Sequence, residues 1–240
     1  VLGRASALIT VSEPLAQALR ERHPKKAVYS VPNAFPESEW RDIPFAQPER
    51  ATFVHAGQLY QGRCDPRPLF EALAELLREG SIDAREVRLD FYGEREPWLE
   101  ELVERYCLRD VVSLHGKRPR EEVLRAERSA SRLLIVLKTA HGRSGAEERG
   151  NYSGKLFEYF GARRRIIALG GPEEETVVDE ALARSGAGER YRSQRRLRDA
   201  VLAAVAEWRT GATAIVAPDA VAPFELRHFG ERFAEILDAC

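Results

Sequence analysis

Cysteine is scarce in this sequence, and methionine is missing altogether. The three cysteines, Cys64, Cys107 and Cys240, form no Cys-x-x-Cys pair and no cluster with histidine. Their number and spacing exclude a disulfide framework and give no support to a zinc site. The default expectation is therefore a reducing, cytoplasmic setting with no bound metal.

Long apolar runs and a strong excess of either charge are also lacking. No stretch approaches the roughly 18 apolar residues that a membrane-spanning helix requires, so no membrane span is expected. A formal net charge of −1 gives no reason to expect nucleic acid as a partner. The chain begins with Val1-Leu2-Gly3-Arg4, which does not resemble a signal peptide, and we expect it to be a segment of a larger protein.

What the sequence does contain is an alternation of short apolar runs and amphipathic helical patterns along most of its 240 residues. The apolar runs are nearly continuous, which is typical of strands that are buried on both faces of a parallel sheet. This alternation predicts an α/β fold with a Rossmann-like, doubly wound parallel sheet. Its expected strands include residues 28–31, 51–56, 87–92, 111–115, 132–137 and 165–169.

A boundary is expected between residues 33 and 50, where the periodicity stops and prolines recur. Proline restricts its own backbone and that of the preceding residue, so this segment should be extended. Before it, two strands and a helix that begins near Ser12 form a βαβ unit too small to have its own core. We therefore divide the chain into this N-terminal remnant with its linker, residues 1–45, and a sheet domain, residues 46–240.

Ligands of open α/β sheets bind beyond the carboxyl ends of the strands, which draws attention to the loops that follow them. Gly57 allows a close approach of the backbone to a ligand, and Arg63 in the same loop could reach a phosphate. After the strand at 111–115, Gly116 exposes backbone groups that suit a base edge, and Arg118 could stack on a flat ring. The alternative for both loops is an ordinary surface turn.

The most informative segment follows a long polar loop at residues 138–152, which is either functional or simply disordered. Ser153 is expected to cap a helix that runs to about residue 162. Free amides at Gly154 and Lys155 would then favour an anion, and Glu158 could accept hydrogen bonds from ribose hydroxyls. The alternative for Lys155 and Glu158 is a solvated place on the helix surface.

These segments resemble, in order, the C-terminal half of GT-B-fold glycosyltransferases, especially the family-4-like retaining enzymes. The sharpest match is Lys155-Leu156-Phe157-Glu158-Tyr159-Phe160 followed by Ile166-Ile167-Ala168-Leu169. Other matches lie at residues 53–59, 89–94 and 112–116, and residues 7–12 with 31–34 resemble the end of the first domain and its hinge. The resemblance covers roughly the whole chain.

The resemblance implies the donor-binding portion of a glycosyltransferase, which transfers a sugar from a nucleotide-diphosphate sugar with retention. Transfer would need no metal or other cofactor, because helix amides and basic side chains offset the charge of the leaving group. The partner would be an N-terminal acceptor-binding domain missing from this sequence, through which peripheral membrane association could occur. Without it, the chain would bind donor but transfer little. The implied contacts are Gly57, Arg63, Gly154 and Lys155 for the diphosphate, Gly116 and Arg118 for the base, and Glu158 for the ribose.

The sequence departs from the family pattern at three places. Many relatives have a second Glu eight positions before the ribose-binding one, whereas this chain has Gly150, so that Glu147 or Glu148 would have to substitute. Gln58 stands where an Arg is usual. Residues 163–165 are three arginines where a proline is common, and we expect them to form a solvated turn.

Two other functions stay open. A nucleotide-sugar epimerase of the same fold would need acid and base residues in the cleft, and the five histidines show no convincing pair. A catalytically inert Rossmann-like binding module is favoured by the missing second Glu and the missing partner domain. The sequence identifies no catalytic residue and does not determine the base, the sugar or the acceptor.

Overall fold

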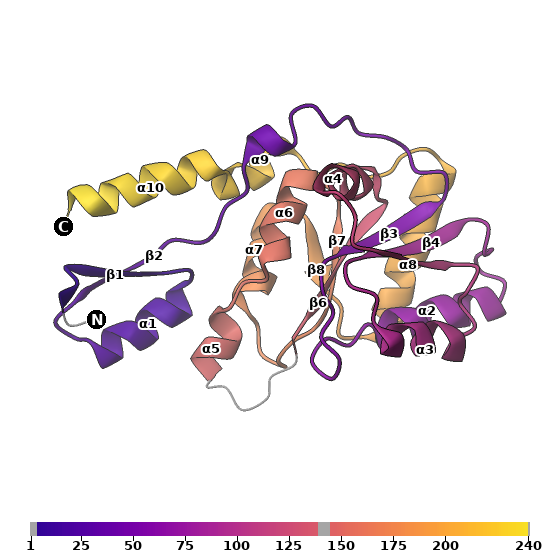
Figure 1. The fold of residues 1–240 in the computed structure, drawn as a ribbon, viewed down its shortest axis with the longest axis horizontal. Helices are drawn as coiled ribbons and strands as arrows, with labels where there is room; N and C mark the ends of the chain where they lie inside the picture. Colours follow the sequence, from indigo (N-terminus) through magenta and orange to yellow (C-terminus); the bar gives the residue numbers. More distant parts are fainter. Residues whose placement is uncertain (1–3, 139–144, 240) are drawn as a thin grey trace.

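The chain forms two parallel β-sheets of unequal size, joined by a linker (Figure 1). The computed structural model describes residues 4–138 and 145–239. The elements, in chain order, are β1 (Ala7–Thr10), α1 (Glu13–Arg22), β2 (Ala27–Ser30), η2 (Glu37–Glu39), β3 (Ala51–Ala56), α2 (Arg67–Arg78), β4 (Val87–Tyr92), α3 (Pro97–Arg105), β5 (Val112–Gly116), α4 (Arg120–Ser129), β6 (Arg132–Leu137), α5 (Gly145–Gly150), α6 (Gly154–Ala162), β7 (Ile166–Gly170), α7 (Val177–Ser185), β8 (Gly188–Arg190), α8 (Gln194–Arg209), α9 (Pro218–Val221), η3 (Ala222–Phe224) and α10 (Leu226–Asp238).

The larger sheet has six strands in the order β5-β4-β3-β6-β7-β8, and every neighbouring pair is parallel. The chain moves outward from β3 to β5 on one side and then from β6 to β8 on the other, so the strand order reverses between β3 and β6. This arrangement confirms the predicted Rossmann-like, doubly wound α/β fold. Five of the six strands, all except β8, were predicted to within about one residue of their ends, as was β2 of the smaller sheet.

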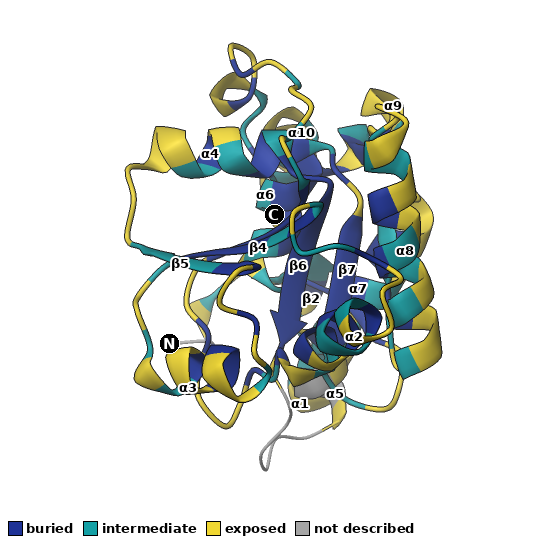
Figure 2. Ribbon diagram, turned by 90° about the vertical axis from the view of Figure 1, so that its right-hand side faces the viewer, coloured by how far each residue is buried: buried dark blue, intermediate teal, exposed yellow. Residues whose placement is uncertain are grey.

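The two central strands, β3 and β6, are buried along their whole length (Figure 2). Successive side chains of a strand point to opposite faces of the sheet, so each strand contributes to two cores. Phe53 belongs to the core under α2, α3 and α8, whereas the adjacent Val54 belongs to the core under α4, α6 and α7. Burial on both faces explains why these strands appear in the sequence as nearly continuous apolar runs.

The N-terminal unit is a small βαβ structure, as predicted. Strands β1 and β2 pair in parallel, and α1 connects them. Among its described residues, from 4 onward, its own buried cluster consists of Leu8, Ala16 and Val28. Ser12 occupies the N-cap position of α1, but its side chain makes no capping hydrogen bond.

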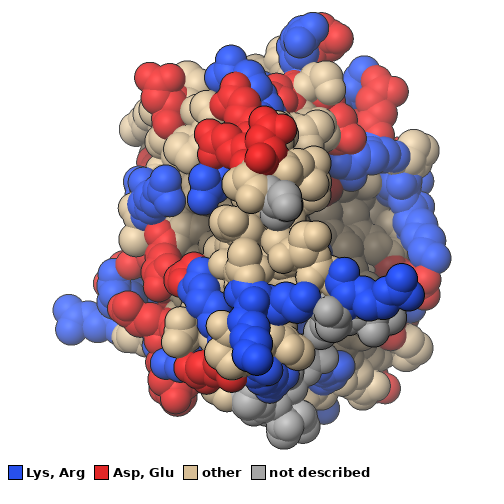
Figure 3. Space-filling view, turned by 90° about the vertical axis from the view of Figure 1, so that its left-hand side faces the viewer, with Lys and Arg blue, Asp and Glu red and all other residues tan. Residues whose placement is uncertain are grey.

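The side of the molecule that presents the N-terminal unit has charges of both signs (Figure 3). Lys and Arg side chains form a band across the middle of this face, and a group of Asp and Glu side chains lies above it. Uncharged atoms separate the two groups. The formal net charge of −1 therefore reflects a balance of opposite charges on this face, not a scarcity of them.

The linker packs against the sheet domain through a cluster of arginines. The guanidinium of Arg128 lies 3.9 Å from the centre of the Phe45 ring, and Arg164 donates hydrogen bonds to the carbonyls of Ala46 and Arg128. The expectation of a solvated turn at residues 163–165 is wrong for Arg164, which is only 2% exposed. The linker covers this side chain, and its carbonyls replace water as hydrogen-bond acceptors.

The last helix, α10, begins at the linker and extends over the N-terminal unit (Figure 1). The backbone of Phe35 exchanges hydrogen bonds with Phe224 and Leu226, which attaches the start of this helix to the linker. In α10, only Ile236 is buried. Within the described part of the chain, no helix combines the length and apolar character that crossing a bilayer would demand.

Candidate functional site

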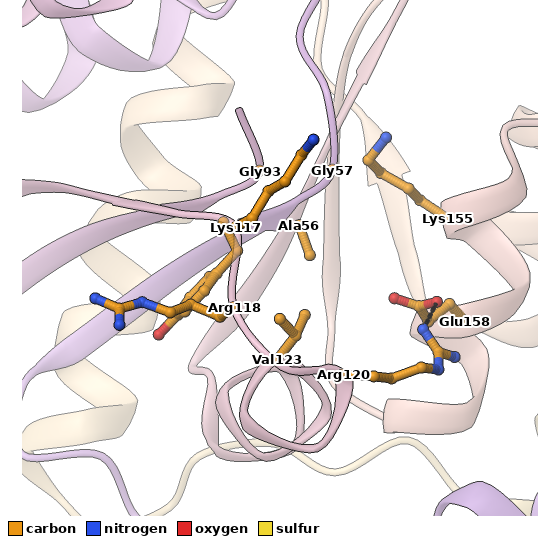
Figure 4. Close-up of a pocket in the computed structure, with 10 residues that line it drawn as sticks. Ala56, Gly57, Gly93, Lys117, Arg118, Arg120, Val123, Lys155 and Glu158 are labelled. Atoms are coloured by element: carbon orange, nitrogen blue, oxygen red, sulfur yellow. Dashed lines mark hydrogen bonds and ion pairs between the residues drawn. The ribbon is translucent and has the colours of Figure 1, made fainter. Parts of the chain in front are cut away.

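A pocket of about 490 Å³ opens at the carboxyl ends of β3, β4 and β5, beside the start of α6 (Figure 4). It lies next to the point where the strand order reverses, which is where open α/β sheets bind their ligands. The residues that line it are Ala56, Gly57, Tyr92, Gly93, Lys117, Arg118, Arg120, Val123, Lys155 and Glu158.

Two glycines bring the ends of β3 and β4 close together at this pocket. The N–H of Gly57 donates to the carbonyl of Tyr92 at 2.6 Å, and a Cβ placed on Gly93 would lie 2.6 Å from the carbonyl oxygen of Gly57. Gly57 has φ +117°, a backbone conformation that side chains with a Cβ rarely adopt. Glycine is therefore required at both positions, because the Gly57 carbonyl and the Lys155 side chain occupy the space that a Cβ would need.

Lys155 extends from the first turn of α6 toward Gly57. Its Nζ lies 2.7 Å from the place where a Cβ of Gly57 would be. Ser153 occupies the predicted N-cap position, but its side chain makes no capping hydrogen bond, so the first amides of α6 are left to other partners. Burial lowers the pKa of Lys155, while the nearby Glu158 carboxylate acts in the opposite direction. The half-buried cation and the helix start together suit an anionic group.

Glu158 lies one turn further along α6 and is held by Arg120 from α4. The Nη1 of Arg120 donates to Glu158 at 2.9 Å, and its Nε donates to Glu39 of the linker at 3.1 Å. Burial acts to lower the pKa of Arg120, but its hydrogen bonds to Glu39 and Glu158 outweigh this effect and raise it. Arg120 therefore stays charged and connects the linker to the pocket.

Two histidines lie near the pocket, and neither of them lines it. Burial, followed by the charge of Lys155, lowers the pKa of His55 to about 3, so this ring is neutral at ordinary pH. His115 contacts the buried Asp90 at 2.9 Å and stacks on Tyr92, with 4.4 Å between ring centres. His115 therefore supports the wall of the pocket, because Tyr92 lines it.

The structure brings together four of the seven predicted site residues. Gly57, Arg118, Lys155 and Glu158 line the pocket, although Arg118 pairs with Glu122 at 3.6 Å and points away from Lys155 in Figure 4. The other three, Gly116, Arg63 and Gly154, are not among its lining residues.

Each of these three lies close to the pocket in the chain or in space. The carbonyl of Gly116 accepts a hydrogen bond from Gly93 and so supports the pocket wall. Arg63 belongs to the turn after Gly57, where its N–H donates to the carbonyl of Tyr60. Gly154 lines a neighbouring hollow with Phe157 and Phe229.

The loop that the sequence singled out at 138–152 is only partly within the described residues. Residues 139–144 and the side chains of Glu147 and Glu148 lie outside them. Gly150 is buried, and a Cβ there would lie 2.7 Å from a side-chain carbon of Leu15 in α1. The position of the second Glu in the family pattern is therefore packed against the N-terminal unit in this chain.

Sequence reasoning missed Arg120 and Glu127, both on α4. They lie seven residues apart, with Val123 and Leu124 between them, a spacing that puts all four on one face of a helix. This shared helix face could have indicated that Arg120 and Glu127 point toward the sheet domain. Most residues of α4 are charged, however, so the whole segment resembled a helix exposed to solvent.

Solved structures with a similar fold include HepE, TarM and WaaG. HepE from Anabaena, in complex with UDP-glucose, has a TM-score of 0.69 at 16% identity, over 98% of this chain and 64% of that one. TarM from S. aureus, in a complex that contains UDP, has a TM-score of 0.65 at 11% identity, over 97% and 44%. WaaG, a glycosyltransferase of lipopolysaccharide biosynthesis, has a TM-score of 0.64 at 18% identity, over 98% and 63%.

These similarities confirm the resemblance to GT-B glycosyltransferases at the level of the fold. The chain spans between 44% and 64% of the length of these three structures. No protein-family model and no curated protein matches the sequence.

Proposed function

We propose that this chain is the donor-binding portion of a glycosyltransferase and binds a nucleotide-diphosphate sugar in the pocket at the ends of β3, β4 and β5. The observation that supports this best is the placement of Lys155 and Glu158, one turn apart on α6. Figure 4 shows the ammonium on the side of Gly57 and the carboxylate beside Arg120. A cation and a carboxylate in these places match a diphosphate and a ribose of one nucleotide.

In the proposed reaction, the bond between the anomeric carbon and the diphosphate oxygen breaks, an acceptor hydroxyl oxygen bonds to that carbon with retention, and the hydroxyl proton passes to the departing diphosphate. The departing diphosphate gains negative charge. Lys155 and the first amides of α6 are positioned to stabilise this charge, so the proposed transfer needs no metal. The Gly57 backbone and Arg63 complete the proposed diphosphate site, and Gly116 and Arg118 provide the proposed base contacts.

The acceptor site is proposed to belong to a further domain. The chain spans only part of the similar glycosyltransferases, and its sheet domain corresponds to their donor-binding half in our interpretation. We therefore expect the 240 residues to bind donor while transferring little sugar on their own.

A second candidate function is a catalytically inert module that binds a nucleotide sugar. The packing of Gly150 against Leu15 favours it, because no carboxylate can extend from that position. Sugar transfer or donor hydrolysis by the full-length protein would distinguish the enzyme from the module.

Titration calorimetry with UDP, GDP, ADP and TDP tests donor binding. Glu158→Ala should weaken binding of the preferred diphosphate by about tenfold or more, because a hydrogen bond to a charged group contributes about 1.5–3 kcal/mol. Lys155→Ala should weaken it similarly and also reduce its dependence on salt. Matched controls are Glu121→Gln and Lys25→Ala at exposed positions. The proposal fails if the wild-type chain binds none of the four nucleotides, or if Glu158→Ala and Lys155→Ala both bind as the wild type does.

A further inference from the structure

A buried carboxyl group, Glu127, lies behind the pocket on the inner face of α4. Its side chain is 0% exposed, and neither of its oxygens has a hydrogen-bond donor among the described residues. An ionised carboxylate in this position would be strongly unfavourable, because it would have lost its water without gaining any donor in exchange.

The carboxyl of Glu158 is the acidic neighbour that acts on Glu127, through its charge and as a possible partner in a hydrogen bond between the two carboxyl groups. Two ionised carboxylates cannot form such a bond, so one of them must hold a proton. Glu158 already accepts a hydrogen bond from Arg120 and lines the open pocket, whereas Glu127 has no charged hydrogen-bond donor of its own. The proton therefore belongs on Glu127.

The charged and titratable groups around Glu127 agree with this assignment. They come from two helices: Arg120 from α4, and Lys155, Glu158 and Tyr159 from α6. Burial raises the pKa of Glu127 well above its usual value, Glu158 raises it further, and the charges of Arg120 and Lys155 lower it by less. The one titratable side chain of β3, His55, packs on Phe91 in the opposite core.

We propose that Glu127 is a positioning residue: as a neutral carboxylic acid it donates a hydrogen bond to Glu158 and fixes that carboxylate in the orientation that accepts the ribose. Arg120 holds the same carboxylate from the other side. This role rests on the proposed function, since Glu158 has a ligand only if the pocket binds a nucleotide.

This role predicts how the affinity for the nucleotide changes with pH. Below the pKa of Glu127 the acid donates its hydrogen bond, and above it two carboxylates repel each other. Affinity for the preferred diphosphate should therefore fall as pH rises through the pKa of Glu127 and stay nearly constant below it.

Two substitutions separate positioning from packing. Glu127→Gln keeps a neutral donor of the same shape, so it should bind the preferred diphosphate as the wild type does at low pH and lose the decrease at high pH. Glu127→Met keeps roughly the volume without the donor, and Glu158 still accepts its hydrogen bond from Arg120. This variant should bind about tenfold more weakly at every pH, the effect expected for a lost hydrogen bond to a charged group. Glu121→Gln on the exposed side of the same helix is the control.

Protonation is tested independently of any ligand by thermal unfolding between pH 5 and pH 9. A carboxyl that keeps its proton in the folded state while the unfolded chain ionises near its usual value destabilises the fold increasingly as pH rises. The Tm of Glu127→Gln should therefore exceed that of the wild type by an amount that grows with pH.

The outcomes distinguish the two proposals. Equal diphosphate affinity of Glu127→Met and wild type, with Glu158→Ala weakened, would overturn the positioning role and leave donor binding intact. A Tm difference between Glu127→Gln and wild type that is constant with pH would overturn the protonation of Glu127. If the wild type binds none of the four diphosphates, the proposed function fails and the positioning role fails with it, while the unfolding comparison still decides whether Glu127 is neutral.

Discussion

Gly57 is the residue whose replacement tests the geometry of the pocket most directly. Gly57→Ala should lower the free energy of unfolding by about 1–3 kcal/mol, because a Cβ is strained at its positive φ. The new methyl group would lie 2.6 Å from the Cε of Lys155 and should displace that side chain, so affinity for the preferred diphosphate should fall as well. Denaturant unfolding and calorimetry measure the two effects.

Gly62→Ala is the matched control for this substitution. Gly62 also has a positive φ, +72°, but a Cβ there would have no neighbour within 4 Å. The Gly62→Ala variant should therefore unfold more easily but keep its affinity for the preferred diphosphate. Equal affinities of the two variants would show that Lys155 does not depend on the space above Gly57.

Lys155 and Glu158 could be predicted as candidates from the sequence, because they follow a helix start after an expected strand. Glu127 and Arg164 could not. Their surroundings are set by distant segments: α6 lies against Glu127, and the linker at Phe45 and Ala46 covers Arg164. A single sequence shows that a residue is charged, but it does not show which distant segment of the same chain will bury that residue.

Helix α6 contains a glycine at which local preference and packing act in opposite directions. Alanine is favoured over glycine inside helices by about 1 kcal/mol. A Cβ at Gly161, however, would lie 2.1 Å from the Nε1 of Trp40 in the linker. Gly161→Ala should therefore lower the free energy of unfolding by about 1–3 kcal/mol, the usual cost of overpacking, as measured by urea unfolding.

Gly230 in α10 provides the comparison, because a Cβ there would meet nothing within 4 Å. Gly230→Ala should raise the free energy of unfolding by up to about 1 kcal/mol. If Gly161→Ala instead raised the free energy of unfolding, Trp40 and the linker would be able to move away from α6 at little energetic cost.

Most strands were predictable because each is encoded by its own pattern, whereas the short strand β8 was not predicted. Burial on both faces makes β3 and β6 continuous apolar runs, and the helices have clear apolar faces. Ser12 and Ser153 both occupy the N-cap position of a helix. Neither side chain, however, makes a capping hydrogen bond to the helix backbone. The backbone angle at a helix start follows from local sequence, whereas the rotamer of a cap depends on its neighbours.

The two sheets should differ in stability within one molecule. In the part of the N-terminal unit that the structure describes, the buried cluster has three residues, and burying one aliphatic side chain contributes only about 1.5–3 kcal/mol. Amides of residues 7–30 should therefore exchange with deuterium faster than those of residues 51–56 and 132–137, which lie in the central strands. Mass spectrometry of peptic fragments measures this difference. Similar protection in both regions would mean that contacts with α5 and α10 make the unit part of one cooperative structure.

All six strands of the main sheet run in the same direction, so every loop that lines the pocket follows the carboxyl end of a strand. The core residues that hold the sheet together lie within the strands, away from these loops. Lys117 and Arg118, which line the pocket, can thus be exchanged without repacking Phe53, Val54 or their neighbours. Under the proposed function, a preference for another nucleotide base would then need only a few changes in this single loop.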